Sequence, residues 1–291
     1  MEKLLITGAA GLLGSSLAPF LAQLGYTVIR HGHTSSPVDV RFDLSDSTAT
    51  LAALRTLQPD VILHLAALTN VELCEEQPQQ AYLGNVRGVE NLCQWISQQQ
   101  QPCFLLHIST DHVYDGPGPH SEEHVCLSNT YAFSKYTAEQ VAARVPATIL
   151  RTNFFGRSQA QKRQSFSDWI VNTLRAGEAL NAVTDILFSP LSIPTLVEQI
   201  ALAVQHKKVG LFNLGSHEGF SKADFILQLA DLLELDRQRI CLIRAAELPQ
   251  KTYRPKDMRM DLSRYEAAFA TTLPTLSSEL QRIKEQYHVR S

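Results

Sequence analysis

A tyrosine and a lysine four residues apart, Tyr131 and Lys135, stand at the start of a stretch with helical patterning. This spacing places a phenol and an ammonium on the same face of a helix. A phenol with an ordinary pKa of about 10 becomes a useful acid or base near neutral pH when a nearby cation stabilises the phenolate. Tyr and Lys are common on helix surfaces, so the pair gains its meaning from what precedes it in the chain.

A hydroxyl-bearing segment comes before this pair. Ser109, Thr110 and Asp111 directly follow the apolar run 103–108, which is typical of a buried strand. Open α/β sheets place their sites at the carboxyl ends of strands, where a hydroxyl can donate to a substrate carbonyl. Together with Tyr131 and Lys135, the segment predicts a site for acid-base chemistry on a carbonyl.

Three glycines, Gly8, Gly11 and Gly14, lie between the apolar run 3–7 and the apolar stretch 12–24. In a strand-turn-helix unit the first permits the tight turn, the second lets the backbone approach a pyrophosphate, and the third lets helix and strand pack closely. The alternative is a glycine-bearing turn that binds nothing. Strand, spacing and helix agree, so we expect a nicotinamide dinucleotide on this turn.

The second expected strand, 26–29, ends in Arg30 rather than in an acidic residue. No acidic residue occurs between Glu2 and Asp39, so the carboxylate that binds a free ribose 2'-hydroxyl is absent from the sequence here. Arg30 could pair with a 2'-phosphate, and we predict NADPH as the preferred cofactor, with NADH as the alternative. Arg30 could also be only an exposed charge. Asp43 and Leu44 are expected to reach the adenine.

Alternating strand and helix patterns predict the elements that position these residues, and with them an α/β fold: a Rossmann-type, doubly wound parallel sheet. The expected strands are 3–7, 26–29, 61–65, 103–108, 147–150 and 210–213. The expected helices are 12–24, 51–57, 80–100, 131–143, 165–176, 195–205, 222–235 and 276–287. After Thr152 helices dominate, which predicts an NAD(P)-binding domain at 1–152 and a smaller, mostly helical substrate lobe at 153–291 that could interleave with it.

The bulk composition excludes several classes of protein. The 291 residues, 44% of them hydrophobic, can bury a large core, and the net charge of -3 gives no basic field for nucleic acid. Five cysteines without a Cys-x-x-Cys or a zinc spacing fit reduced thiols and no metal site. No apolar run reaches the roughly 18 residues of a membrane span. We therefore expect a cytoplasmic protein with no membrane partner.

With these pieces in place, the chain resembles the extended short-chain dehydrogenase/reductase family, and within it most closely the dTDP-4-dehydrorhamnose reductases. The resemblance covers nearly the whole chain. Besides the glycine turn and the Tyr131/Lys135 pair, it rests on segments 64–69, 109–116, 149–152, 189–190 and 254–255, and on Asn85, Asn91, Leu262, Leu273 and Pro274.

The resemblance implies a catalytic set of Thr110, Tyr131 and Lys135. Tyr131 would protonate the sugar C4 oxygen as hydride arrives, Lys135 would hold the cofactor ribose and lower the pKa of the tyrosine, and Thr110 would orient the carbonyl. The expected cofactor contacts are Gly8, Ala10, Gly11, Leu12, Leu13, Arg30, Asp43, Leu44, Ala66, Ala67, Tyr131 and Lys135. The expected substrate contacts are Thr69, Asp111, His112 and Phe154.

The chain also departs from the pattern of such reductases. His112 stands where they tend to have Tyr, and could be a second proton donor or a polar wall of the site. Phe154 stands where they tend to have Trp. The loop 185–190 lacks an amide and a glycine, and Phe188 within it could narrow the substrate pocket.

Other polar residues are discounted as site residues. His64 and His107 fall in apolar strands and are expected to be hydrogen-bonded core residues. Glu122 and Glu123 are expected to face water.

The sequence thus predicts NADPH-dependent reduction of a 4-keto-6-deoxy nucleotide sugar. An epimerase or dehydratase of the same family would keep the site but retain its cofactor through the cycle. A cofactor-binding regulatory subunit would have no chemical need for both Tyr131 and Lys135. A homodimer is the assembly that we consider for the chain.

Overall fold

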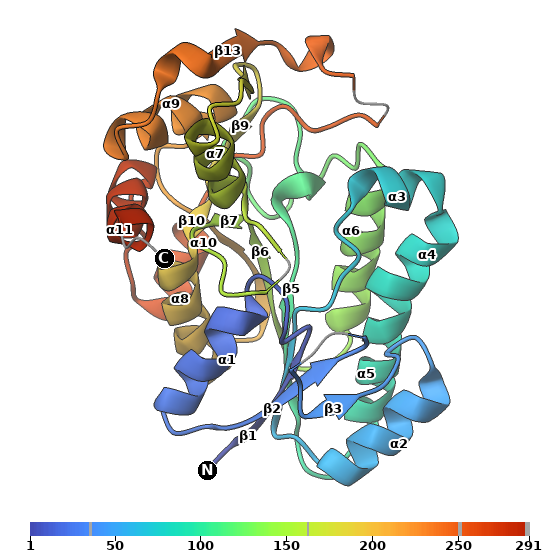
Figure 1. The fold of residues 1–291 in the computed structure, drawn as a ribbon. Coiled ribbons are helices and arrows are strands. Elements are labelled where there is room, and N and C mark those ends of the chain that lie inside the picture. Colours follow the sequence, from blue (N-terminus) through green and yellow to red (C-terminus); the bar gives the residue numbers. More distant parts are fainter. Residues whose placement is uncertain (35–36, 162, 250–251, 289–291) are drawn as a thin grey trace.

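The computed structural model describes residues 1–34, 37–161, 163–249 and 252–288, and its centre is a parallel sheet (Figure 1). Within those ranges the sheet has seven strands: β1 (Lys3–Thr7), β2 (Thr27–Gly32), β3 (Val40–Arg41), β4 (Val61–His64), β5 (Phe104–Ile108), β6 (Ala147–Thr152) and β11 (Gly210–Leu214). Their order is β11-β6-β5-β4-β1-β2-β3, so the winding reverses at β1. The predicted doubly wound, Rossmann-type α/β fold is confirmed.

Helices cover both faces of the sheet, which is why its strands are continuous apolar runs such as Leu4, Leu5 and Ile6, each 0% exposed. One face carries α1 (Gly14–Gln23) and α8 (Ile193–His206), and the other carries α2 (Ser47–Leu57), α5 (Gly88–Ser97) and α6 (Thr130–Ala142) (Figure 1). A separate apolar core lies on each side.

The single helix predicted over residues 80–100 is divided in the structure. It consists of α4 (Pro78–Tyr82), the π-helical turn η1 (Leu83–Arg87) and α5, and α3 (Val71–Glu76) precedes them. The π turn carries Asn85, whose side-chain oxygen accepts from the Leu68 backbone N at 2.6 Å and whose amide donates to Ser134 Oγ at 2.9 Å. This side chain ties the segment after β4 to α6, which carries Tyr131. A local widening of the helix at a functional site is a common use of π turns.

The segment after Thr152 builds a further apolar core and also returns to the sheet. Besides α8, its helices among the described residues are α7 (Phe166–Arg175), α9 (Lys222–Leu232), α10 (Ser263–Phe269) and α11 (Leu276–His288). Its short strands are β7 (Phe154–Phe155), β8 (Leu180–Val183), β9 (Leu187–Phe188), β10 (Leu191–Ser192), β12 (Phe220–Ser221) and β13 (Ile240–Ile243), and the 3-10 turns of the chain are η2 (Asp111–Val113), η3 (Arg237–Arg239) and η4 (Ala245–Glu247). β11 and α8 come after Thr152 in the chain but pack with residues 1–152, so the two parts interleave. The domain boundary at 152/153 therefore stays a prediction.

Two further features of the fold concern the length of its helices and the state of its thiols. Among the described residues, no helix combines the length and the apolar character that crossing a membrane requires. All five cysteines are free thiols, and burial raises the pKa of Cys93 and of Cys103 to about 12. These two thiols are therefore inert core residues.

Candidate functional site

A cavity of about 930 Å³ opens at the carboxyl ends of β1, β2, β4, β5 and β6. Parallel strands expose their last residues and following loops there, so segments far apart in the chain meet at one edge. The structure brings almost all of the predicted site residues to its wall: Gly8, Ala10, Gly11, Leu12, Leu13, Asp43, Leu44, Ala66, Ala67, Thr69, Thr110, Asp111, His112, Tyr131, Lys135 and Phe154. Arg30 is not among the lining residues.

The glycine turn forms one end of this cavity. Gly8 has a φ of +68°, which L side chains rarely adopt, and a Cβ on Gly14 would lie 2.5 Å from the Gly8 carbonyl oxygen. No side chain caps the N-terminus of α1. The Ser15 and Ser16 N–H groups donate to the Gly11 and Leu13 carbonyl oxygens, whereas the N–H groups of Leu12 and Leu13, just before the helix, have no partner among the described residues and line the cavity. Available N–H groups and the positive end of a helix dipole fit the pyrophosphate of a dinucleotide.

Arg30, which was expected to meet a cofactor phosphate, does not line the cavity and pairs with Asp39 instead. Its guanidinium Nη2 binds Asp39 Oδ1 at 2.7 Å, and both side chains are about two-fifths exposed, at 41% and 40%. This acidic partner lies nine residues further along the chain, beyond the end of β2. His33 and Thr34, which the sequence did not suggest, line the cavity after β2 instead.

The three expected catalytic side chains lie together where β5 ends and α6 begins. Asn129 caps α6 by accepting from the Ala132 backbone N at 2.9 Å, which fixes the first turn and its Tyr131. Lys135 donates from Nζ to the Ile108 carbonyl oxygen at 2.8 Å. Tyr131 and Lys135 are 8% and 3% exposed, so their polar ends are withdrawn from bulk water.

Burial dominates the ionisation of this set. It raises the pKa of Tyr131 to about 12, with a smaller contribution from Asp111, while a hydrogen bond with Thr110 acts in the opposite direction. Burial also lowers the pKa of Lys135 to about 8, against the attraction of Glu139. Lys135 was expected to lower the pKa of Tyr131, and the raised value differs because desolvation of a phenolate outweighs the neighbouring charges.

The other end of the cavity carries the expected substrate contacts. Asn153 donates from Nδ2 to Asp111 Oδ2 at 2.7 Å, and burial raises the pKa of Asp111 to about 6 despite this bond and the charge of Lys222. The His112 ring meets the Tyr131 ring edge-on, with 5.5 Å between centroids. Burial lowers the pKa of His112 to about 3, so the ring is neutral at pH 7. A neutral imidazole favours the polar-wall interpretation over a cationic second acid.

Lys222, which no sequence motif singles out, stands behind this wall as the first residue of α9. Its Nζ lies 5.6 Å from the centre of the Phe166 ring and has no hydrogen bond or ion pair with a described residue. Burial is the main cause that lowers its pKa, and Asp111 attracts its charge. A cation at a helix N-terminus is unfavourable because it opposes the helix dipole. A lysine at the start of the predicted helix 222–235 was therefore the sequence signal that could have singled out Lys222.

Further polar residues line the cavity without having been selected, among them Arg163, Gln164 and Arg254. Arg254 holds Glu72 in an ion pair of 2.5 Å between Nη2 and Oε2. The Arg-Pro pair at 254–255 was part of the family resemblance, which was the signal for it. Asn153 directly follows β6 at the same edge of the sheet, where a polar residue is expected to face a ligand.

Three minor expectations are wrong. Phe188 does not line the cavity, because it packs in the core of the C-terminal part, 5.4 Å from the Phe225 ring between centroids. Glu122 is buried, at 4% exposure, and accepts from the Asn213 backbone N at 2.9 Å, whereas Glu123 does face water. His107 is buried, but neither ring nitrogen has a partner among the described residues; His64 bonds to Thr7 as expected.

Comparison with known proteins agrees with this geometry. A model of the family described as the RmlD substrate binding domain matches residues 1–289. A dTDP-4-dehydrorhamnose reductase of Sinorhizobium fredii is 29% identical over 83% of this chain and 85% of its own length. A probable low-salt glycan biosynthesis reductase of Haloferax volcanii is 26% identical over 97% of each chain.

A solved structure shares the fold across almost its full length. A dTDP-4-dehydrorhamnose reductase of Bacillus anthracis, solved in complex with NADP, superposes with a TM-score of 0.87 at 22% identity, over 98% of this chain and 99% of that one. The structural likeness shows the fold, and the family model shows the family: the chain belongs to the RmlD substrate-binding-domain family, which fits the extended short-chain dehydrogenases/reductases that its sequence resembles.

Proposed function

We propose that this protein is an oxidoreductase that uses NADPH to reduce a 4-keto-6-deoxy nucleotide sugar, as a dTDP-4-dehydrorhamnose reductase does. The observation that carries the proposal is a single cavity with the glycine turn at one end and Thr110, Tyr131 and Lys135 beside it. A turn for a pyrophosphate and an acid for a carbonyl oxygen are the two parts that such a reduction requires.

When bound, the cofactor supplies the hydride, and the side chains of this chain supply the proton and the orientation. A pKa of about 12 keeps the Tyr131 phenol protonated at neutral pH, so its proton is available to the carbonyl oxygen. The Thr110 hydroxyl accepts from the His112 backbone N at 3.2 Å and donates to Asp111 Oδ1 at 3.4 Å, a long bond that it would exchange for one to the same carbonyl oxygen. Lys135, mostly charged at pH 7 with a pKa of about 8, offsets the negative charge left on Tyr131.

The substrate is proposed to occupy the end of the cavity away from the glycine turn. Thr69, Asp111, His112 and Phe154 offer hydrogen bonds and one aromatic face to a sugar ring. Arg163 and Arg254 supply guanidinium groups of the kind that bind phosphate oxygens in two-pronged fashion. A nucleotide diphosphate linked to a sugar matches both sets.

NADPH is preferred over NADH in this proposal. The Bacillus anthracis reductase with the same fold was solved with NADP. In this chain Arg30 could meet a 2'-phosphate only by breaking its ion pair with Asp39. His33 and Thr34, by contrast, already line the cavity.

The test follows the absorbance of the reduced nicotinamide when the protein is mixed with a panel of nucleotide 4-keto sugars. The parent should oxidise NADPH, and Tyr131→Phe should lower kcat by a factor of about 10² to 10⁴, because general acid catalysis contributes on that order. Cofactor affinity, measured by fluorescence titration, should stay unchanged. Turnover by Tyr131→Phe at the parent rate would remove Tyr131 from its role.

The same experiment separates the alternatives. A sugar product formed without net oxidation of NADPH would indicate an epimerase or a dehydratase. Retained cofactor affinity with no turnover of any sugar would indicate a regulatory subunit. We also propose a cytoplasmic location, where reduced cofactor and nucleotide sugars meet, and a homodimer, which light scattering of the purified protein would test.

A further inference from the structure

The ion pair between Glu139 of α6 and Arg151 of β6 lies wholly inside the protein. Their side chains are 1% and 0% exposed, and Arg151 donates from Nη2 to Glu139 Oε2 at 2.6 Å and from Nε to Oε1 at 2.9 Å. Burying two charges costs about as much as their attraction returns, so a buried pair is weak evidence for a stabilising role. The contacts that these two side chains make beyond each other indicate another role.

Glu139 is linked to the candidate site by two routes. It follows Lys135 by one helical turn on α6, and of the described residues it is the one whose charge raises the pKa of that lysine against burial. It also accepts from Ser109 Oγ at 2.5 Å. Ser109 lines the cavity and directly precedes Thr110. One carboxylate therefore acts on Lys135 through its charge and on Ser109 through a hydrogen bond.

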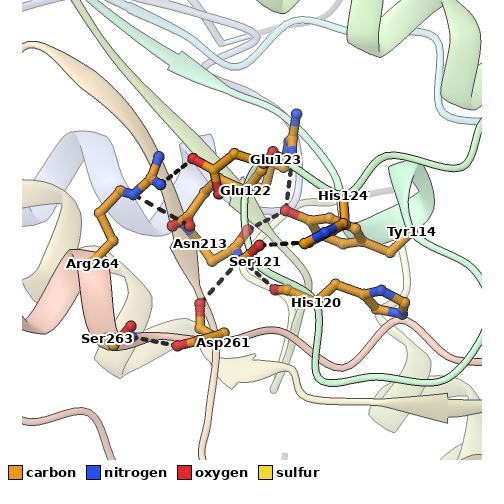
Figure 2. Close-up of polar contacts among 11 residues, drawn as sticks. Tyr114, His120, Ser121, Glu122, Glu123, His124, Asn213, Asp261, Ser263 and Arg264 are labelled. Carbon is orange, nitrogen blue, oxygen red and sulfur yellow. Dashed lines mark hydrogen bonds and ion pairs between the residues drawn. The ribbon is translucent and has the colours of Figure 1, made fainter.

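Arg151 fixes this carboxylate from behind through a network that spans several elements. Its Nη1 donates to Tyr114 Oη at 2.7 Å and to the Glu122 carbonyl oxygen at 2.8 Å. Tyr114 donates to Asn213 Oδ1 at 2.7 Å, and Figure 2 shows Asn213 of β11 joined in turn to the Glu122 carboxylate. The guanidinium is thus held by Glu139 of α6, by the segment after β5 and, through Tyr114, by β11.

The surroundings of Lys135 contain no equivalent of Glu139 in the described part of the chain. The titratable groups around it are His64 of β4, His107 of β5, and Tyr131 and Glu139 of α6. Both histidines have lowered pKa values because they are buried and because the lysine charge repels a second cation. They remain neutral and leave the charge of Lys135 unbalanced without Glu139.

We propose that Glu139, held by Arg151, is a positioning residue that keeps Lys135 charged and fixes Ser109 at the cavity wall. This proposal rests on the proposed reduction for its consequence, since an ammonium beside Tyr131 is what the proton transfer requires. Arg151, in this view, orients Glu139 and has no contact with substrate.

The test uses a double variant, Glu139→Gln/Arg151→Met, because Glu139→Gln alone leaves a buried guanidinium unpaired and could prevent folding. Titration of lysine labelled with ¹³C at Cε, with Lys135 assigned through Lys135→Met, reports the protonation of this side chain without any substrate. Removing the carboxylate removes the attraction that favours the charged form, so the midpoint for Lys135 should move to lower pH.

A matched control is Glu279→Gln. Glu279 is also buried, at 2% exposure, and accepts from the Ser192 backbone N at 2.6 Å and from Thr195 Oγ1 at 2.7 Å, in the C-terminal part of the chain. It should cost stability but leave the Lys135 midpoint in place. A folded double variant whose Lys135 midpoint equals that of the parent would overturn the proposal.

Activity supplies a second readout. With a reducible sugar, the alkaline limb of kcat/KM should move to lower pH in the double variant, with a fall of at least about threefold at pH 8, while Glu279→Gln keeps the parent profile. If the parent reduces no sugar, the proposed function fails, and the titration of Lys135 still decides the role of Glu139. Glu139→Asp keeps the carboxylate on a shorter side chain. Where this carboxylate still reaches Arg151, the Lys135 midpoint and the pH profile should equal those of the parent. A shifted midpoint in this variant would mean that the role requires the longer side chain of glutamate.

Discussion

The two ends of the cavity are built in different ways. The cofactor end is made largely of backbone, since the turn from Gly8 to Gly14 presents N–H groups and almost no charge. The substrate end is made of side chains, among them Thr69, Asp111 and Arg254, which come from segments more than 30 residues apart in the chain. A site formed by backbone groups can be recognised in the sequence as a local pattern. A site formed by side chains from distant segments cannot.

The two ends also differ in how they lower the stability of the protein. At the substrate end, burial shifts the pKa values of Asp111, His112 and Lys222 toward their neutral forms. At the cofactor end the cost is conformational, because the turn needs a positive φ at Gly8 and tolerates no side chain at Gly14. Substitutions that add volume should therefore damage one end, and substitutions that change charge should damage the other.

Gly14→Ala should have the largest effect on cofactor binding. The new Cβ would lie 2.5 Å from the Gly8 oxygen and 2.6 Å from the Ala9 Cα, so the turn must move. We expect NADPH affinity to fall by about 100-fold and stability by about 1–3 kcal/mol, as overpacking does. Fluorescence titration with NADPH and urea unfolding measure the two.

Gly25→Ala is the matched control, because Gly25 has a φ of +91°, has no atom within 4 Å of the place that a Cβ would take, and lies outside the cavity. It should lose stability and keep its affinity for NADPH. Parent affinity in a folded Gly14→Ala protein would mean that the pyrophosphate lies elsewhere.

Asp111→Asn should show how much stability the protein loses by burying a carboxylate at the substrate end. The pKa of Asp111 is about 6 in the folded protein against 3.8 for an ordinary aspartate, so the folded state binds the proton more tightly and the charged form costs stability. That cost is absent below about pH 4, grows as pH rises through 6, and is complete above it. Two pKa units correspond to about 3 kcal/mol as an upper limit, and we expect a gain of about 1–2 kcal/mol for the variant at pH 8.

Urea unfolding at pH 4 and pH 8 measures this gain, which should appear only at the higher pH and be accompanied by weaker substrate binding. Asp231→Asn, at an exposed ion pair with Arg237, should leave the pH dependence of unfolding as in the parent. An Asp111→Asn protein that is less stable than the parent at pH 8 would show that the carboxylate is better solvated than its burial indicates.

The fold and the cofactor end could be predicted from the sequence because their physics is local. The run Lys3–Thr7, the glycine spacing and the next helix are contiguous, and the i, i+4 spacing of Tyr131 and Lys135 holds in any helix. Lys222 and Glu139 could not be found in this way. Their significance depends on the residues that folding places beside them, which for Lys222 is Asp111, a carboxylate 111 positions earlier in the chain.

Lys222→Met should raise KM for the sugar by about tenfold and leave cofactor affinity unchanged. The methionine keeps the apolar length over Phe166 but removes the cation behind the cavity wall whose charge attracts Asp111. The carboxylate that faces the sugar would then lose its counter-charge. Steady-state kinetics at saturating NADPH give the value. Lys208→Met, at an exposed position, should match the parent, and a Lys222→Met enzyme with the KM of the parent would place Lys222 outside the substrate end.

Arg30→Ala should have the smallest effect, and it divides the sequence-based prediction from the structure. The sequence assigns Arg30 to the cofactor 2'-phosphate, whereas the structure pairs it with Asp39 outside the cavity. Arg30 lies outside the cavity and its exposed ion pair is worth about 0–1 kcal/mol, so breaking the pair should change NADPH affinity by less than about fivefold.

Titrations with NADPH and NADH, on Arg30→Ala and Asp39→Ala, separate the two assignments. If Asp39 withholds the guanidinium from the cofactor, Asp39→Ala should tighten NADPH and leave NADH unchanged, because only the former carries a charge for the released Arg30 to meet. A loss of tenfold or more for NADPH alone in Arg30→Ala would instead show that Arg30 leaves Asp39 when the cofactor binds. In that case the cofactor end also contains a side chain whose partner changes on binding, and its contrast with the substrate end would be one of degree.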